Sequence, residues 1–336
     1  MVMVMPMDEM TQKKRLIERV RDFPRLSVAV VGDIMLDVMR YGHSRATKEA
    51  AAFALKVDDG KTNYALGGAG NVAANIRSLG AQVDLYGVLG EDDAGRRIRA
   101  LCKVVGITLI ALKDGQTISK ERYFSAEHGT CVFRADFGES PQTLLPLALQ
   151  KTTELLKLFR LNAKRYSGIA LSDYNKRVFR GDLGQRVLGI ARRSKLVSIV
   201  DPKPENASLL LGGTLVRPNH EEAESIVGVK GLSDRELVRL LKQKMKSTYA
   251  SITCGARGLV MYDGGFHSIP TFARKVYDVT GAGDTVVAVM LLTLASGGDG
   301  VEAGILATHA AGLAVEKLGT AVVTAGELIR RITFRP

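Results

Sequence analysis

The amino-acid sequence predicts an α/β fold, in which helices cover both faces of a mainly parallel β-sheet and a small lid of β-strands projects from it. Short apolar runs alternate along the chain with stretches of helical period, as parallel strands and their connecting helices do. Residues 41–66 and 116–137 interrupt this alternation with Thr-, Tyr- and Phe-containing segments that suit antiparallel lid strands. No proline- or serine-rich linker divides the chain, so we expect one core with a lid.

The alternation starts near the N-terminus. Residues 11–22 place their apolar side chains on one stripe, which predicts an amphipathic helix that Pro24 ends. Residues 26–31 are apolar and predict a buried parallel strand that ends next to Asp33. Further strands are expected at residues 83–87, 168–172, 196–201, 213–216, 249–254 and 258–262. Helices are expected at residues 70–79, 94–105, 144–161, 180–194, 221–227 and 233–244, and again after Gly281.

The chain is basic. Its 336 residues include 47 Lys and Arg against 35 Asp and Glu, which leaves a formal charge of +12. Such an excess suits a protein that binds nucleic acid, an anionic membrane or small anionic substrates, and the charge alone does not choose among them. The 46% hydrophobic content is ordinary for a globular protein and excludes collagen-like, coiled-coil and disordered classes.

Cysteine usage and the apolar segments indicate a cytoplasmic protein. Cys102, Cys131 and Cys254 are far apart and lack the spacing of metal ligands, so three thiols in a reducing compartment are expected. Residues 1–7 are too short an apolar segment for a signal peptide, and we expect a disordered leader there. The longest apolar stretch, residues 286–295, is too short to span a bilayer.

Two glycine-rich segments carry the candidate chemistry. In the first, Gly67 and Gly68 allow a close backbone approach to a ligand, and Asn71 and Asn75 share one face of the following helix, where they could bind sugar hydroxyls. The alternative is a tight turn into a buried helix of small residues. A dinucleotide site is excluded because the G-x-G-x-x-G pattern is absent.

The second segment runs through residues 278–285. The successive amides of Gly281, Ala282 and Gly283 precede an apolar helix, and such a helix start binds anions. Asp284 is then placed to accept a proton from a hydroxyl that attacks a phosphoryl group. A helix-capping carboxylate is the alternative for Asp284. No Walker-type phosphate loop is present.

Together the two segments resemble the PfkB, or ribokinase-like, family of carbohydrate kinases. The amino-terminal pattern can be followed through Gly67, Gly68, Asn71, Ala73, Gly80 and Gly90, and the carboxy-terminal pattern through Asp278, Gly281, Ala282, Gly283 and Asp284. The resemblance implies a ribokinase-like three-layer sandwich that uses ATP and Mg²⁺. It also implies that Asp284 is the general base and that the amides of residues 281–283 form the anion hole.

The same resemblance implies a nucleotide site. Asn219 and Glu222 match the family's N-x-x-E element, which helps to organise Mg²⁺, through water, and the phosphates. The expected nucleotide contacts are Thr253, Gly255, Gly258, Lys317 and Gly319.

Across nearly the whole chain, the sequence is more closely similar to the heptose 7-phosphate kinases of lipopolysaccharide-core synthesis. Residues 32–37, 44–50, 117–120, 134–137, 172–176, 201–203, 277–286 and 317–320 carry this similarity. It implies transfer of the γ-phosphoryl group of ATP to the anomeric hydroxyl of heptose 7-phosphate, which gives the 1,7-bisphosphate for ADP-heptose synthesis. Such proteins often continue into a nucleotidyltransferase domain, but this sequence has no H-x-G-H, so only the kinase half is expected.

These similarities give each candidate residue a role. We expect the sugar hydroxyls to contact Asp33, Asp37, Gly67, Gly68 and Asn71. We expect a phosphate already on the substrate to contact the basic lid residues Arg45, Lys120, Arg122 and Arg134, because a guanidinium binds phosphate oxygens bidentately. For each of these bases a solvated surface charge is the alternative.

The same reasoning predicts the domain organisation and the binding partners of the chain. Residues 1–24 are expected to form a leader and helix, and residues 25–336 the kinase domain with its lid. Exposed lid strands could pair across a two-fold axis, so we expect a homodimer, without nucleic acid or membrane partners. Val289 departs from the general family pattern. Residues 48–54, Ala65, Thr308 and His309 depart from the pattern of the heptose kinases, which keeps open a kinase for another substrate, such as fructose 6-phosphate, ribose or a nucleoside. A catalytically silent sugar-binding regulator and a nucleic-acid binder are the alternatives from other classes.

Overall fold

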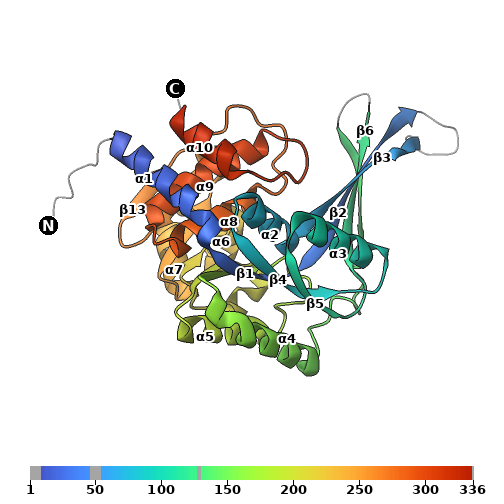
Figure 1. Ribbon diagram of the computed structural model, residues 1–336, viewed down its shortest axis with the longest axis horizontal. Helices are drawn as coiled ribbons and strands as arrows, with labels where there is room; N and C mark the ends of the chain where they lie inside the picture. The colour runs from blue at the N-terminus through green and yellow to red at the C-terminus, as the bar shows by residue number, and fades with distance from the viewer. Residues whose placement is uncertain (1–8, 46–53, 127–129, 335–336) are drawn as a thin grey trace.

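Apolar runs form the central sheet of the molecule. In the computed structural model, which describes residues 9–45, 54–126 and 130–334, nine strands pair in the order β13-β12-β11-β10-β9-β8-β1-β4-β5 (Figure 1). Their bounds are β1 (Ser27–Gly32), β4 (Gln82–Leu89), β5 (Thr108–Lys113), β8 (Gly168–Ser172), β9 (Val197–Asp201), β10 (Leu215–Val216), β11 (Tyr249–Thr253), β12 (Leu259–Tyr262) and β13 (Phe266–Ile269). Pairing is parallel from β5 to β11, and β12 and β13 add antiparallel. The mainly parallel sheet is therefore confirmed.

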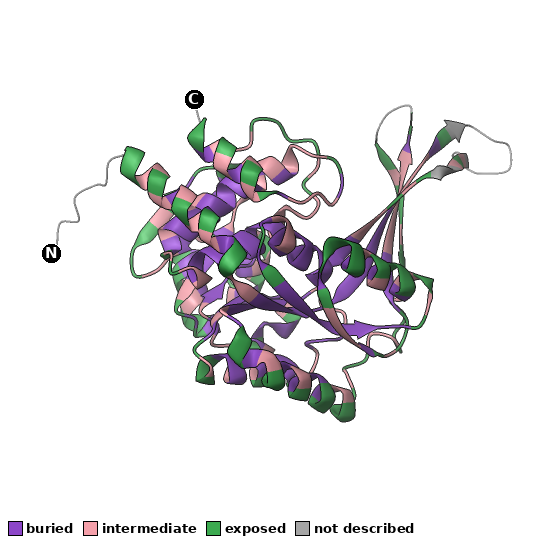
Figure 2. Ribbon diagram, viewed as in Figure 1, coloured by how far each residue is buried: buried purple, intermediate pink, exposed green. Residues whose placement is uncertain are grey.

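Helices cover both faces of this sheet. One layer contains α1 (Glu9–Asp22), α2 (Ala69–Ser78), α3 (Asp93–Val105), α8 (Ala282–Ala295), α9 (Gly300–Val315) and α10 (Ala325–Thr333), and the other contains α4 (Leu149–Asn162), α5 (Leu183–Arg193), α6 (His220–Val227) and α7 (Asp234–Met245). Strand β1 serves both layers, because Val28 and Val30 join one core cluster whereas Ala29 and Val31 join the other. Figure 2 shows the sheet buried between exposed outer helix surfaces. This arrangement is the predicted three-layer sandwich.

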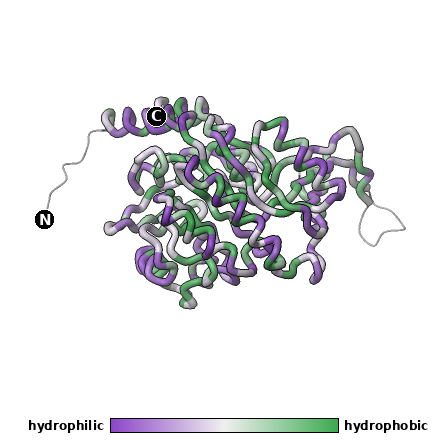
Figure 3. The backbone as a smooth tube through the Cα atoms, turned by 60° about the horizontal axis from the view of Figure 1, so that its bottom comes forward, coloured by the Kyte–Doolittle hydropathy of each residue, from purple (hydrophilic) through white to green (hydrophobic). Residues whose placement is uncertain are grey.

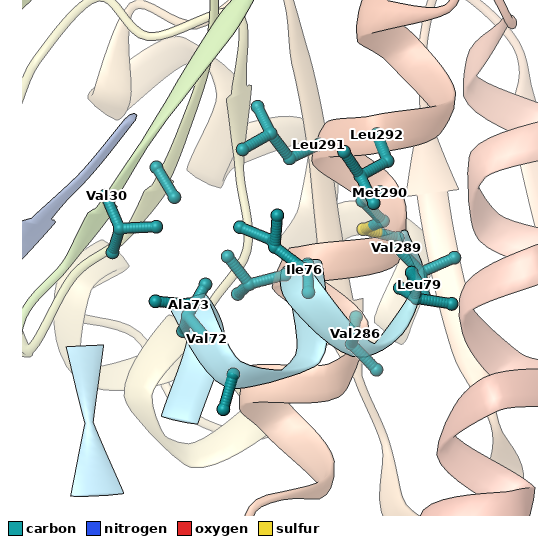
Figure 4. Packing of buried hydrophobic residues seen from close by; sticks show 14 of the residues in the cluster. Val30, Val72, Ala73, Ile76, Leu79, Val286, Val289, Met290, Leu291 and Leu292 are labelled. Carbon is teal, nitrogen blue, oxygen red and sulfur yellow. The ribbon is translucent and has the colours of Figure 1, made fainter. Parts of the chain in front are cut away.

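Helices α2 and α8 pack closely beneath the two glycine-rich segments. Ile76 of α2 and Leu79 directly after it lie against Val286, Val289 and Met290 of α8 in the core (Figure 4). Small residues in α2 permit this close approach, and α8 is apolar around its whole circumference because it is buried on all sides. The packing fixes the N-termini of both helices next to each other, which brings the two segments into one site.

The lid is a second sheet, which projects from the body at the right of Figure 1. Its strands pair in the order β3-β2-β6-β7. They are β2 (Ile34–Arg45), β3 (Ala54–Gly68), β6 (Ile118–Ser125) and β7 (Cys131–Phe137). The pairs β2–β3 and β6–β7 are antiparallel, and the central pair β2–β6 is parallel. The described parts of these strands lie largely within residues 41–66 and 116–137, where lid strands are expected.

The structure corrects several details of the sequence prediction. Strand β2 already begins at Ile34, so the lid includes residues 34–40, and its central pair is parallel rather than antiparallel. The helix expected at residues 144–161 begins only at Leu149, because Pro146 disfavours a helix before it. Strands β5 and β13 were not predicted. The seven expected strands are all present, with bounds within two residues of those predicted.

The N-terminal helix belongs to the same packed body. Leu16 and Val20 of α1 and Phe23 of the following 3₁₀ turn (Phe23–Arg25) are buried in the core, and α1 lies beside α10 (Figure 1). Three further 3₁₀ turns are Ala163–Arg165, Pro204–Leu209 and Gly255–Arg257. Figure 3 shows hydrophobic segments running through the interior and mixed hydropathy along α1. The leader expected at residues 1–7 lies outside the described residues. No helix within the described ranges is long and apolar enough to cross a bilayer.

Candidate active site

Polar residues gather where the central parallel strands end. Asp33 follows β1, Asp173 follows β8, Asp201 ends β9 and Arg217 follows β10. The strand order reverses between β1 and β8, since the chain continues from β1 outward to β4 and β5 and later returns on the other side. In open α/β sheets a crevice forms outside the strand ends at such a switch point, and ligands bind there.

Asp284 lies at the centre of this region. It occupies the first turn of α8 with only 4% of its surface exposed. Its two carboxylate oxygens accept hydrogen bonds from the Asn71 amide at 2.8 Å and from the Tyr174 hydroxyl at 2.7 Å. Burial raises the pKa of Asp284 to about 7, and these two hydrogen bonds oppose that rise. A carboxyl with this pKa can act as a base near neutral pH.

The helix start beside Asp284 is shaped to receive an anion. Gly281 caps α8 with a φ of +79°, and a Cβ there would lie 2.6 Å from the Asn71 amide nitrogen, so only glycine fits. The first amides of a helix have no partner within the helix and point outward. One of the three predicted amides, that of Ala282, donates to the Val279 carbonyl at 3.3 Å. The amides of Gly283 and Asp284 continue the helix start.

A buried cation lies against this helix start. A Cβ on Gly283 would lie 3.3 Å from the Arg217 guanidinium, which is 5% exposed and pairs with Asp201 at 2.7 Å. Burial raises the pKa of Asp201, and Arg217 opposes the rise. The Nε atom of Arg217 is buried without a hydrogen-bond partner in the part of the chain that the structure describes. An anion at the α8 N-terminus would meet both a helix dipole and this charge.

Two carboxylates shape the loop that positions Tyr174. Asp33 accepts from the backbone amides of Tyr174, Lys176, Arg177 and Val178 at 3.0–3.2 Å. Asp173 accepts from the amides of Asn175 and Lys203 and from the Asn206 side chain at 2.8–3.0 Å. Burial raises the pKa of Asp173 to about 6, with a further contribution from Asp33.

The four amides on Asp33 correct the role given to it above. Its carboxylate oxygens are engaged by the backbone of the loop, so Asp33 organises that loop, and the sugar contact assigned to it is not supported by the geometry.

Asp37 faces the site from the lid. It lies on β2, where its carboxylate accepts from Arg122 at 3.2 Å and from the Thr320 hydroxyl at 3.0 Å. Gly67 lies alongside on β3, and a Cβ there would approach the carboxylate to 2.8 Å. Gly68 caps α2 with a φ of +57°. Asp37, Gly67, Gly68 and Asn71 therefore lie close together where the lid joins the start of α2.

The predicted lid bases share the face of Asp37. Register pairs Asp37 with Lys120 and Arg122 with Arg134, and paired residues lie on the same side of a sheet. Arg134 is about half exposed and forms two hydrogen bonds with Asp136 at 2.7 and 2.8 Å. The side chain of Arg45, at the end of β2, lies outside the described residues.

A second lysine joins this face from the body. Lys176 pairs with Glu139 at 2.8 Å, and Lys120 lies 3.6 Å from the same carboxylate. The side chains of Lys120 and Lys176 are only 12% and 16% exposed. Burial lowers the pKa of Lys120, and the charge of Lys176 lowers it further. Lys120 also lies 3.5 Å from Asp136, so this cluster combines four cations (Lys120, Arg122, Arg134 and Lys176) with three carboxylates (Asp37, Asp136 and Glu139). The remaining excess of positive charge beside Asp37 would attract a phosphate.

Asn219 and Glu222 form a capping box at the start of α6. The Asn219 side chain accepts from the Glu222 amide at 2.9 Å, and Glu222 accepts from the Asn219 amide at 3.0 Å. Glu222 also forms an ion pair with Lys203. Burial would lower the pKa of Lys203, but Glu222 and then Asp201 outweigh that effect and raise it. The acidic side chain thus lies close to the Arg217–Asp201 pair.

The other predicted nucleotide contacts lie in three separate places. Thr253 bridges to Asn219, and the turn that follows contains Gly255 and Gly258, both with positive φ. Gly319 lies across the site, where its amide donates to Asp278 at 3.0 Å. Lys317 instead reaches α10, where its Nζ pairs with Glu327 at 2.8 Å and donates to the Val322 carbonyl. The structure therefore does not bring Lys317 to the others.

Tyr174 and Arg217 are site residues to which the sequence analysis gave no role, whereas the position of Lys176 just after a predicted strand already indicated a ligand-binding edge. Tyr174 touches Asp284, Lys176 joins Lys120, and Arg217 lies against the α8 N-terminus. The available signal was their position, because each follows directly on a predicted parallel strand or lies a few residues beyond one.

Comparison with known proteins decides the family. Residues 25–325 match the sequence profile of the pfkB family of carbohydrate kinases. The chain belongs to this family. The family consists of carbohydrate kinases, and the geometry of Asp284 with the adjoining helix start would suit phosphoryl transfer to a sugar hydroxyl.

Several relatives of this kinase share one name. The chain is 37% identical over 320 residues to the "Bifunctional protein HldE" of Caulobacter sp. (strain K31), which covers 92% of this chain and 63% of the relative. It is also 37% identical over 326 residues to the protein of the same name from Coxiella burnetii, covering 92% of this chain and 64% of the relative. The chain thus spans slightly less than two thirds of the length of these relatives.

Solved structures confirm the ribokinase-like fold of the kinase. Phosphofructokinase-2 from Escherichia coli, in complex with potassium, superimposes with a TM-score of 0.76 at 18% identity, covering 92% of this chain and 99% of that one. Ribokinase from Arabidopsis thaliana, complexed with ribose and ATP, gives a TM-score of 0.69 at 17% identity with the same coverage.

Proposed function

We propose that this kinase transfers the γ-phosphoryl group of ATP to the anomeric hydroxyl of heptose 7-phosphate, giving the 1,7-bisphosphate used for ADP-heptose. The observation that carries the proposal is the cluster of Lys120, Lys176, Arg122 and Arg134 beside Asp37, in which four cations outnumber three carboxylates. A sugar without a phosphate has no group for these cations, whereas a sugar phosphate does. The similarity of the sequence to heptose 7-phosphate kinases supports the heptose as the sugar, and the matching relatives share the name "Bifunctional protein HldE".

The reaction follows from the contacts of Asp284. In its ionised form the carboxylate accepts the proton of the sugar hydroxyl, and the resulting oxygen attacks the γ-phosphorus of ATP. The bond from that phosphorus to the bridging β–γ oxygen breaks, and ADP leaves with the electron pair. Asn71 and Tyr174 orient the carboxylate through hydrogen bonds to its two oxygens. Such positioned proton transfer accelerates reactions by about a hundredfold to ten-thousandfold.

Charge stabilisation comes from the helix start and Arg217. Phosphoryl transfer needs positive potential around the phosphoryl oxygens more than covalent chemistry. The α8 N-terminus and the buried guanidinium beside Gly283 supply that potential. The unpartnered Nε of Arg217 is consistent with an anionic ligand at this place.

The residues fit Mg²⁺ held mainly by nucleotide phosphates and water. Mg²⁺ keeps several waters and uses one or two protein carboxylates. Glu222, partly engaged by Lys203 and the Asn219 amide, would supply that carboxylate through water, with Asn219 holding its orientation. When bound, the ion neutralises charge on the β- and γ-phosphates.

A substrate panel tests the proposal. We expect ADP release with heptose 7-phosphate to exceed release with fructose 6-phosphate, ribose or nucleosides by at least tenfold in kcat/KM. Turnover of another sugar without turnover of heptose 7-phosphate would replace the proposal by a pfkB-type kinase for that sugar. Absence of turnover with every acceptor would favour a sugar-binding regulator.

Removal of the lysine pair should weaken sugar-phosphate binding selectively. In Lys120→Met/Lys176→Met we expect KM for heptose 7-phosphate to rise at least tenfold, because two charge-assisted contacts to the phosphate are lost. The KM for ATP should stay within twofold. The exposed pair Lys103→Met/Lys230→Met is the matched control. An equal rise in both KM values would contradict a sugar-phosphate pocket.

Tyr174→Phe should shift the pH dependence of turnover. Burial raises the pKa of Asp284 to about 7, so kcat/KM should fall as the pH decreases through about 7 and the base becomes protonated. The Tyr174 hydroxyl stabilises the ionised carboxylate, so its removal should move this limb to higher pH, by about one unit for one hydrogen bond to a charge. A pH–rate profile of both proteins measures the shift. If kcat fell but the acidic limb of the pH–rate profile stayed at the same pH, Tyr174 would act only by packing and not by stabilising the ionised carboxylate.

We also propose that the kinase works in the cytoplasm as a homodimer joined through its lids. Cys102, Cys131 and Cys254 are free thiols, as suits a reducing compartment. Strands β3 and β7 form the edges of the lid sheet, and Phe133 and Phe137 on β7 are 58% and 47% exposed. An edge with exposed aromatic residues suits pairing with a second copy.

A further inference from the structure

A groove of about 530 Å³ lies between α4 and α5 on the outer surface of the molecule. Lys157 and Arg160 line it from α4, and Arg186 and Arg193 line it from α5. Figure 1 shows these two helices side by side, and Figure 2 shows their outer surfaces exposed. Because α4 and α5 cover the face of the sheet opposite α8, the groove is separate from the site of Asp284.

The groove concentrates positive charge. Its lining includes four cations and no carboxylate. Arg186 lies 3.7 Å from Asp182, whereas Lys157, Arg160 and Arg193 have no ion pair among the described residues. Residues 149–165 and 182–195 together carry nine Lys and Arg against two acids, a net +7 out of the chain's +12. Adjacent like charges repel each other, so an anion bound among them is favoured.

The floor of the groove is apolar and has a gap. Leu156 and Ile190 form it and are both 6% exposed. Gly189 lies in the interior of α5, although glycine is unfavourable inside a helix. A Cβ on Gly189 would have only the Arg193 guanidinium within 4 Å, at 3.6 Å. The missing side chain leaves space over the apolar floor that an organic group could fill.

We propose that this groove binds a small organic phosphate of the nucleotide class. Its phosphates lie among Lys157, Arg160 and Arg193, and its planar body rests on Leu156 and Ile190 in the gap at Gly189. The volume lies within the range of small-molecule sites, about 300–1,000 Å³. Arginine suits the task because its guanidinium binds phosphate oxygens bidentately. The lining of α5 extends over two helical turns, about 10 Å, which suits one nucleotide better than an extended nucleic acid.

Counting bound ADP on the full chain tests the proposal. Equilibrium dialysis with labelled ADP at 150 mM KCl should give two equivalents for the unaltered protein, one in each site. Arg160→Glu/Arg193→Glu reverses the charge, and Gly189→Leu fills the gap without changing the charge. Each should bind one equivalent less. The control Lys103→Glu/Arg239→Glu makes the same charge change on the exposed surfaces of α3 and α7, and it should bind as many as the unaltered protein.

Three outcomes would overturn the proposal. The first is equal ADP stoichiometry in the unaltered protein and both groove variants. The second is an equal loss in the control, which would show attraction to net charge alone. The third is inorganic tripolyphosphate binding to the groove as tightly as ADP, which would show that the organic body makes no contact. If the active site did not bind nucleotide, the unaltered protein, the groove variants and the control would each bind one equivalent of ADP less than expected. Failure of the proposed function therefore remains distinguishable from failure of the groove proposal.

Discussion

Asp284→Asn should lower kcat about a thousandfold, the middle of the range for loss of a positioned general base. An amide has nearly the shape of the carboxylate but cannot accept the proton of the sugar hydroxyl. Asn71 and Tyr174 both donate to Asp284, so the substituted amide can accept from either through its oxygen while the site keeps its form. Binding of ATP should change little. Steady-state ADP release and nucleotide titration measure the two effects.

Measuring the folding stability of Asp284→Asn distinguishes a catalytic defect from a folding defect. The pKa of Asp284 is raised to about 7 by burial, so the folded protein holds a proton that the unfolded chain releases near pH 4. The unaltered protein therefore loses stability as pH rises from about 4 to about 7, whereas the variant, whose side-chain amide does not titrate, keeps it. We expect Asp284→Asn to match the unaltered protein at pH 4 and to exceed it in urea denaturation at pH 8.

A surface carboxylate provides the control for this variant. Asp93 is 85% exposed at its side chain, and Asp93→Asn should change neither kcat nor the pH dependence of stability. Near-normal turnover of Asp284→Asn would refute its assignment as the base. Reduced stability at pH 8 would instead show that the carboxylate charge supports the fold.

The body of the fold could be predicted because buried parallel strands leave a strong pattern. Residues 168–172, for example, form an apolar run between polar stretches and are confirmed as β8. The lid could be predicted only in part. Residues 34–36 are apolar and buried, so they resemble core, yet they begin the lid strand β2. Strand β13 is four residues long with mixed burial, which leaves little period to recognise.

The site could be predicted where local backbone geometry demands glycine. Gly281 must adopt positive φ beside Asn71, and that demand is visible in the sequence as a glycine-rich segment before a helix. The role of Asp33 could not be read in this way, because its four amide donors come from a loop more than 140 residues later. Tyr174 and Lys176 are single polar residues in that loop, and only the pairing of β1 with β8 brings them to the site.

Arg217→Met should impair both stability and catalysis. Asp201 would then remain buried without its cation, and breaking a buried ion pair costs about 3–5 kcal/mol of unfolding free energy. Loss of the charge beside the α8 N-terminus should lower kcat about a hundredfold to a thousandfold, as for removal of one stabilising donor. Because burial raises the pKa of Asp201, the loss of stability should shrink as pH falls and the unpaired carboxyl takes up a proton.

A double variant assigns these two effects to different causes. Arg217→Met/Asp201→Leu removes both buried charges, and apolar replacement of a buried pair is often neutral for stability. We therefore expect urea denaturation to show recovery of most of the lost stability while kcat stays low. Arg165→Met, which breaks the Arg165–Asp84 pair, should leave kcat unchanged. If kcat recovered together with stability, Arg217 would act only through the fold, and the positive potential at the anion site would come from the helix start alone.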